Sequence, residues 1–126
     1  MKTIVHIDSD PQQQAMLRLL FESNPVQVIC FSDYESAKEY LDSAKDIKLV
    51  VTEISENREA RDNYLDPFLK KLHEQGRFLI VLTEFRDADA IEHYQKKGID
   101  GWFTKPVSRD NFYMTALALM NLMPTT

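Results

Sequence analysis

The chain has 126 residues, 44% of them hydrophobic and 28% charged, which is enough to bury one core and suits a single domain spanning residues 1–126. The formal net charge of −5 argues against a nucleic-acid partner, because binding to a phosphate backbone depends on clustered Lys and Arg. No apolar run approaches the roughly 20 residues of a transmembrane helix, and Met1–Lys2 leads directly into a strand pattern. These features predict a cytoplasmic protein with no membrane partner.

Short runs of β-favouring apolar residues alternate with helical patterns along the chain. The predicted strands are Thr3–Ile7, Val26–Phe31, Ile47–Ile54, Phe78–Leu82 and Gly101–Thr104. The first, third and fourth are nearly continuous Val, Ile and Leu, which is typical of parallel strands covered on both faces. The sequence therefore predicts an α/β fold with a doubly wound, five-stranded parallel sheet.

Each predicted helix begins at a residue type that caps helix N-termini, and most end near Gly or Pro. The predicted helices run from Asp10–Pro11 to Asn24–Pro25, from Ser32 or Asp33 past Leu41, from Asp66–Pro67 to Gly76, from Asp87 to Gly98, and from Ser108 to about Met123.

Polar side chains follow four of the predicted strands. They appear as "IDSD" after the first strand, "TE" after the third, "LTE" after the fourth and "TKP" after the fifth. Strand ends near a surface are often polar, so a purely structural role is one interpretation. Ligand sites of doubly wound sheets form outside the carboxyl ends of the strands, however, and four such ends carry carboxylate, hydroxyl or ammonium groups. This convergence favours a functional site.

The whole chain resembles the receiver domains of two-component response regulators, most closely in "GIDGWFTKP" and "LVVTEI". The resemblance implies a flavodoxin-like sheet with strand order 2-1-3-4-5. It also implies phosphoryl transfer from a histidine kinase to an aspartate after the third strand, assisted by Mg²⁺. In this sequence the phosphoacceptor position is occupied by Glu53. The pocket and switch positions correspond to Asp8, Ser9, Asp10, Thr83, Glu84, Trp102, Lys105 and Pro106.

Three of these positions depart from the family pattern. Glu53 replaces the phosphoacceptor aspartate, Ser9 replaces an acid that resembles a direct metal ligand, and Glu84 replaces a small residue beside the pocket. Mg²⁺ requires near-octahedral oxygen geometry and is held by one or two protein carboxylates. We therefore expect a degenerate, non-enzymatic receiver with no cofactor and no metal, which acts as a phosphorylation-independent interaction module. The alternative is a working receiver that still accepts a phosphoryl group with Mg²⁺.

The carboxylate of Glu53 is expected to reach the Lys105 ammonium and the Thr83 hydroxyl, as a charge-assisted contact in a partly buried pocket. This contact either holds the site in a form resembling the phosphorylated state or is an inert remnant of a former site. His6, inside the first strand, is interpreted as a core histidine whose hydrogen bonds are satisfied.

The segment "SENREARDNYLDPF" after the third strand is longer by about six residues than the corresponding loop of the family. If Leu65–Asp66–Pro67 resumes the family pattern, Asn57–Asn63 is an insertion beside the site. It is too polar for a core segment. We expect either a solvated loop or a flap or short helix that recognises a partner.

The last predicted helix carries no charge in the thirteen residues after Asp110. Receivers commonly dimerise or bind partners through the face formed by the fourth helix, fifth strand and fifth helix, so the resemblance implies a homodimer or a signalling-protein partner there. The polar residues of this helix could instead keep it solvated. The periodicity turns Phe112, Ala116, Leu119, Met120 and Met123 toward the sheet, and predicts an interface made of Tyr113, Met114 and Leu117.

Overall fold

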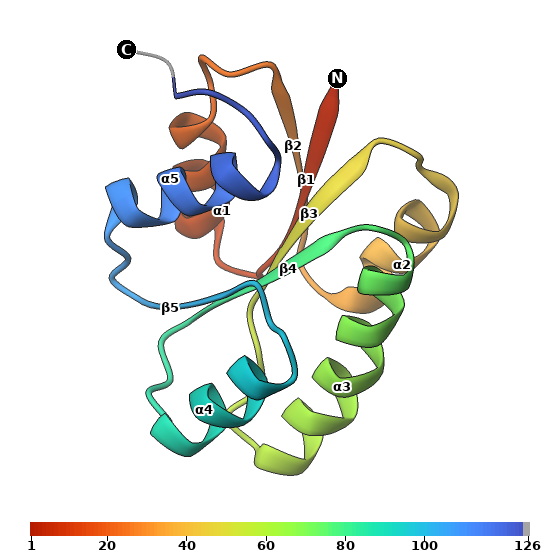
Figure 1. Cartoon of the computed structure of the whole chain (residues 1–126), viewed down its shortest axis with the longest axis vertical. Helices are drawn as coiled ribbons and strands as arrows, with labels where there is room; N and C mark the ends of the chain where they lie inside the picture. Colours follow the sequence, from red (N-terminus) through yellow and green to blue (C-terminus); the bar gives the residue numbers. More distant parts are fainter. Residues whose placement is uncertain (125–126) are drawn as a thin grey trace.

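In the computed structural model, which describes residues 1–124, strands and helices alternate from end to end (Figure 1). In chain order the elements are β1 (Lys2–Ile7), α1 (Pro11–Leu20), β2 (Val26–Phe31), α2 (Tyr34–Ser43), β3 (Ile47–Thr52), α3 (Arg58–Glu74), β4 (Phe78–Thr83), α4 (Ala88–Lys96), β5 (Gly101–Thr104) and α5 (Arg109–Leu119). The strands are parallel in the order β2-β1-β3-β4-β5, which confirms the predicted doubly wound sheet. None of the helices in this part of the chain combines the length and the apolarity needed to cross a membrane.

Helices cover both faces of the sheet, with α1 and α5 on one face and α2, α3 and α4 on the other (Figure 1). Side chains of a strand alternate between these two layers. Ile4 and Leu49 are buried against α1 and α5, whereas Val5 and Val50 are buried against α2 and α3. Both faces of β1 and β3 are therefore apolar, which explains their nearly continuous Val, Ile and Leu.

The predicted capping residues begin and end most of the helices. The side chains of Asp10, Asp33 and Asp87 each accept a hydrogen bond from a backbone N–H in the first turn of α1, α2 and α4. Gly76 and Gly98 follow α3 and α4 with φ of 71° and 89°, a left-handed conformation that glycine adopts without a steric penalty.

The prediction that the third helix begins at Asp66–Pro67 is wrong, because α3 begins at Arg58 and contains Pro67. Of the alternatives for the Asn57–Asn63 insertion, the solvated loop and the flap are wrong, and the helical form is present as the start of α3. Asn57 caps the helix by accepting the N–H of Ala60 at 2.9 Å, and the remaining residues form its first turns. A continuous buried stripe outweighs the backbone hydrogen bond that Pro67 cannot donate. The stripe consists of Arg61, Leu65, Phe68, Leu69 and Leu72.

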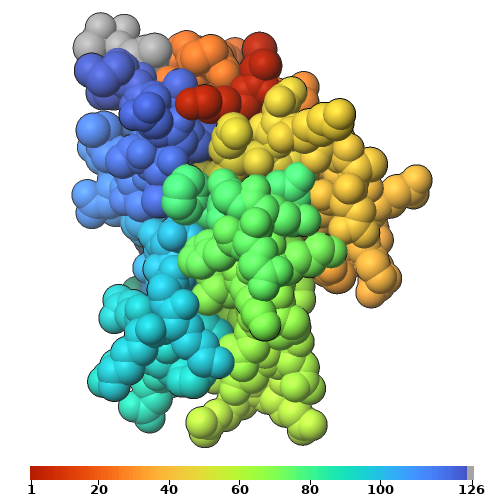
Figure 2. Space-filling view, turned by 45° about the vertical axis from the view of Figure 1, so that its right-hand side comes forward, coloured from red at the N-terminus to blue at the C-terminus, as the bar shows by residue number. Residues whose placement is uncertain are grey.

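The added turns of α3 are bonded to α4, beside which they lie at the lower end of the molecule (Figure 2). Arg61 is only 6% exposed and places Nη1 3.2 Å from Oδ2 of Asp87, the capping residue of α4. The buried Tyr94 hydroxyl donates to Oδ1 of Asp62 at 2.6 Å. The extension is therefore part of the packed structure.

We expect the substitution Asp62→Ala to lower the free energy of unfolding by about 2 kcal/mol, because the buried Tyr94 hydroxyl loses its acceptor and Arg61 loses one of two carboxylates. Glu59→Ala removes an exposed carboxylate from the same extension and should change the free energy of unfolding by less than about 0.5 kcal/mol. Urea denaturation of both variants measures the difference. Equal losses would contradict a specific role for Asp62.

The orientation predicted for the last helix is partly wrong. Leu117 was expected to face outward, but it is 1% exposed and packs beside Phe112 in the core under α5. The helix ends at Leu119 rather than near Met123, since Asn121 adopts a left-handed conformation with φ of 56° just beyond it. Met123 was expected to face the sheet and is 82% exposed instead.

Of the three residues predicted for an interface on α5, Met114 alone is strongly exposed, at 51%. Tyr113 is half-buried, and its hydroxyl donates to Oδ1 of Asn24 at 3.0 Å. Leu117 is not available to a partner because it belongs to the core.

Candidate functional site

The predicted site residues meet at the carboxyl ends of the strands. Asp8 follows β1, Glu53 follows β3, Thr83 ends β4, and Lys105 follows β5. The backbone N–H of Glu53 donates to the Ile7 carbonyl at 2.9 Å, and that of Lys105 donates to the Thr83 carbonyl at 2.7 Å. Both residues thus continue the sheet ladder, which fixes the direction in which their side chains leave the backbone.

Lys105 joins two carboxylates. Its Nζ donates to Oδ2 of Asp8 at 2.9 Å and to Oε2 of Glu53 at 2.8 Å. The exposed fractions of the Lys105, Asp8 and Glu53 side chains are 15%, 3% and 26%. The predicted contact between Glu53 and Lys105 is present, and Asp8 belongs to the same cluster.

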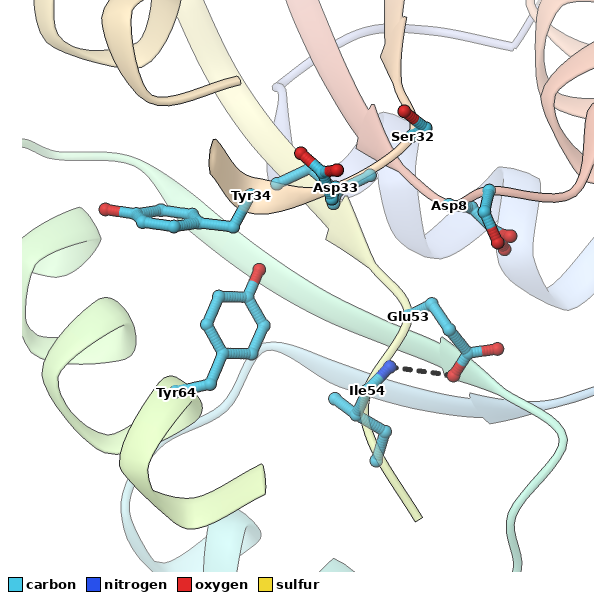
Figure 3. A pocket seen from close by; sticks show the side chains of 9 residues that line it. Asp8, Ser32, Asp33, Tyr34, Glu53, Ile54 and Tyr64 are labelled. Carbon is cyan, nitrogen blue, oxygen red and sulfur yellow. Dashed lines mark hydrogen bonds between the residues drawn. The ribbon is translucent and has the colours of Figure 1, made fainter. Parts of the chain in front are cut away.

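The other oxygens of the two carboxylates also have donors. Oε1 of Glu53 accepts the backbone N–H of Ile54 at 2.7 Å, drawn as the dashed line in Figure 3. Oδ1 of Asp8 accepts the backbone N–H of Asp10 at 2.9 Å. Because each oxygen is held by at least one hydrogen bond, the two carboxylates are fixed in place as well as partly neutralised.

Burial lowers the pKa of Lys105, but the hydrogen bonds to Glu53 and Asp8 outweigh burial, so the net direction of the pKa is upward. The side chain therefore stays an ammonium at neutral pH. With two carboxylates and one ammonium, the cluster carries a net charge of −1.

Thr83 is fully buried, and its hydroxyl accepts the backbone N–H of Phe85 at 3.2 Å. Within residues 1–124, no hydrogen bond joins Thr83 to Glu53, so the predicted contact between them is absent. β4 and β3 are neighbours, but the short hydroxyl of Thr83 is turned toward the backbone that follows its own strand.

Most of the remaining predicted pocket residues lie around the cluster of Asp8, Glu53 and Lys105. Ser9 and Asp10 are exposed in the loop after β1, where Asp10 caps α1. Glu84 is exposed after β4, as is Pro106 after β5. Trp102 lies farther away in the packed layer of α4, where its ring stacks on Tyr94 with the centroids 6.1 Å apart.

Comparison with solved structures identifies this arrangement of strands and helices. A response regulator from Thermotoga maritima shares 20% identity with a TM-score of 0.81, covering 96% of this chain and 98% of that chain. A response regulator receiver protein from Burkholderia phymatum shares 16% identity with a TM-score of 0.78 and covers both chains completely. A receiver domain protein from Clostridium thermocellum shares 19% identity with a TM-score of 0.77, over 96% of this chain and 95% of that one. The chain has the receiver-domain fold. No family model matches the sequence, and no curated protein matches it.

His6 lies beneath the polar cluster of this receiver fold and was not recognised as unusual from the sequence. It is fully buried, and neither ring nitrogen has a hydrogen-bond partner within residues 1–124. Nε2 is 3.9 Å from Oδ2 of Asp8, too far for a hydrogen bond. The prediction that its hydrogen bonds are satisfied is therefore wrong.

The surroundings of His6 favour its neutral form. Burial lowers its pKa most strongly; Asp8 raises it, while Lys105 and Arg18 lower it further, and the outcome is a pKa of about 4. Loss of hydration is the dominant cause because the ring makes no hydrogen bond that would stabilise a charged imidazolium.

A cleft of about 250 Å³ opens beside the polar cluster of Asp8, Glu53 and Lys105. It lies between the ends of β1, β2 and β3 and the first half of α3 (Figure 3). Tyr34 and Tyr64 line it together with the carboxylates of the strand ends. Neither tyrosine was predicted as a site residue, since neither lies at a strand end. Tyr64 enters the cleft because α3 starts eight residues earlier than Asp66. The full lining is Ile7, Asp8, Ser9, Ser32, Asp33, Tyr34, Glu53, Ile54 and Tyr64.

Proposed function

We propose that this chain is a degenerate receiver domain of a two-component signalling system, which acts as an interaction module and carries out no phosphoryl transfer. The observation that carries the proposal is the Glu53 carboxylate, which occupies the phosphoacceptor position and is held by the Lys105 ammonium and the backbone N–H of Ile54. In a working receiver, as the resemblance implies, an aspartate at this strand end accepts the phosphoryl group and acids after the first strand bind Mg²⁺. Here a glutamate replaces that aspartate, and Ser9 replaces one of the acids.

The donor set does not fit a magnesium ion. Mg²⁺ needs oxygen ligands at octahedral positions about 2.1 Å away, and it repels a nearby ammonium. Ser9 offers a hydroxyl where the family has an acid. The misfit supports a function that needs neither metal nor phosphate.

The fixed Glu53 side chain also supports an interaction role. Its two oxygens bind an ammonium and a backbone N–H, two kinds of donor that would stabilise an acidic group at this strand end. The strand ends are thereby held in one arrangement without a ligand. A partner that recognises this arrangement would bind the chain constitutively.

The test is incubation with a small phosphodonor and excess Mg²⁺, followed by intact-mass spectrometry. We expect no added phosphoryl mass. The double variant Ser9→Asp/Glu53→Asp, which restores two family acids, is the positive control and should gain one phosphoryl group. Phosphorylation of the unaltered chain would establish the alternative of a working receiver.

A further inference from the structure

The cleft beside the polar cluster has two walls of different chemistry (Figure 3). One wall is aromatic, made of Tyr34 at the start of α2 and Tyr64 in α3. The other wall is made of Asp8, Asp33 and Glu53, and the carboxylates of Asp8 and Glu53 are turned toward Lys105. A volume of about 250 Å³ is below the range of roughly 300–1,000 Å³ typical for drug-sized ligands, so the cleft suits one side chain rather than a whole metabolite.

The negative charges of the residues that line the cleft are only partly neutralised. It contains three carboxylates and no cationic side chain, and the single charge of Lys105 is shared by Asp8 and Glu53 just behind it. Asp33 is exposed and caps α2 with Oδ1 at 2.7 Å from the Ser36 nitrogen. Its hydrogen bonds to Ser36 lower the pKa of Asp33, so that the group stays ionised. The three acidic residues of the lining and Lys105 together carry a net charge of −2.

The aromatic wall is rigid. Phe68 stacks on the Tyr64 ring at a centroid distance of 5.3 Å, and the Tyr34 ring packs at a steep angle to both, with centroid distances of 5.5 and 5.2 Å. The Tyr64 hydroxyl is bonded to that of Thr52 at 2.8 Å, which fixes the tilt of the ring. Tyrosine rings that cannot turn away attract a planar cation placed over them.

We propose that this cleft binds an arginine side chain of a protein partner, with the guanidinium against the Tyr34–Tyr64 wall and facing the carboxylate of Asp33. The proposal rests on the proposed function as an interaction module and names the chemistry of its partner. A guanidinium is planar, stacks on aromatic rings and bonds carboxylates in a bidentate fork, whereas an ammonium does neither as well. The α3 extension creates the site, since it brings Tyr64 to the end of the sheet.

The first experiment uses N-acetyl-arginine methylamide as a probe, titrated into the ¹⁵N-labelled chain in the absence of Mg²⁺ and phosphodonor. We expect saturable NMR shifts centred on the amides of Ser9, Asp33 and Ile54, with a dissociation constant in the millimolar range for one side chain. The citrulline analogue has the same shape without the charge. It should bind at least about tenfold more weakly, as expected when a charge-assisted contact is lost.

Variants separate the two walls. Tyr34→Leu keeps apolar volume but removes the ring, and Asp33→Asn keeps the helix cap but removes the charge. Each should weaken binding of the arginine probe by about fivefold. The matched control is Tyr40→Leu, which removes a tyrosine from the same helix at a position that packs on Phe31 outside the cleft. It should bind the probe like the unaltered chain.

Three outcomes would overturn the proposal. They are the absence of saturable shifts, equal affinity for the arginine and citrulline probes, and equal affinity of Tyr34→Leu and Tyr40→Leu. The last would indicate only diffuse attraction of a cation to an acidic surface. None of these outcomes would show that the chain accepts a phosphoryl group. Phosphorylation of the chain, in turn, would not exclude arginine binding. The mass measurement and this titration therefore test the two proposals independently.

Discussion

Replacing Lys105 with Met is expected to lower the free energy of unfolding by about 3 kcal/mol. The substitution leaves the Asp8 and Glu53 carboxylates close together with no cation between them, and Asp8 is only 3% exposed. The expected loss is at the lower end for breaking a buried ion pair, because Glu53 is 26% exposed. Urea denaturation near neutral pH measures it.

Lys71→Met is the matched control for this prediction. Lys71 contacts Asp42 at 2.9 Å, the distance between Lys105 and Asp8, but both partners are exposed. Its loss should cost no more than about 1 kcal/mol. Similar losses for the two variants would show that the cluster at the strand ends is no stronger than a surface ion pair.

The pH range over which the Lys105 contacts stabilise the fold follows from the raised pKa of Lys105. The folded pKa lies above the value of 10.5 for the free side chain, so the unfolded chain releases the proton first as pH rises. The stabilisation is therefore fully present below about pH 10.5 and is lost as pH rises through the folded pKa. As pH rises from neutral, the difference between the unaltered chain and Lys105→Met should begin to shrink in that alkaline range.

Acidification is expected to destabilise the protein by about 3 kcal/mol between pH 6.5 and about pH 4 through His6 alone. The folded state lowers the pKa of His6, so the unfolded chain takes up a proton first as pH falls. Above pH 6.5 His6 is neutral in both states and carries no protonation penalty, and the penalty grows as pH falls toward 4. Denaturation midpoints measured across this range give the slope.

The variant His6→Leu should lack this acid-dependent loss and should be at least as stable as the unaltered chain near neutral pH, because two unpaired ring nitrogens are removed from the core. His93→Leu, on the exposed face of α4, is the control and should keep the full pH dependence. A His6→Leu variant with an unchanged slope would show that another group titrates.

The parallel strands and the polar cluster could be predicted because both depend on local patterns, whereas the strand order was implied by the resemblance to receiver domains. The runs of Val, Ile and Leu predict buried parallel strands, and their carboxyl ends must meet at one edge of the sheet. That edge brings Glu53 to Lys105 without further information about packing. The start of α3 was missed because Asp66–Pro67 is a strong local start signal, whereas the helix follows a buried stripe through Arg61 and Leu65.

Two other features depend on contacts between distant residues, which no local pattern contains. The last helix has no charged residue after Asp110, so its polar face is weakly marked and the inward position of Leu117 could not be distinguished from an outward one. The missing partners of His6 follow from which side chains surround β1 in three dimensions. A buried polar residue in a strand pattern indicates burial but not whether a donor or acceptor is nearby.

The bonds from the α3 extension to α4 have a consequence for local unfolding. α4 cannot separate from the rest of the molecule without exposing the buried Arg61 and breaking the hydrogen bond between Tyr94 and Asp62. We therefore expect the first turns of α3 and the whole of α4 to open as one cooperative unit, with one shared protection level of their backbone amides against hydrogen exchange. Because Trp102 stacks on Tyr94, the indole ring belongs to that same unit.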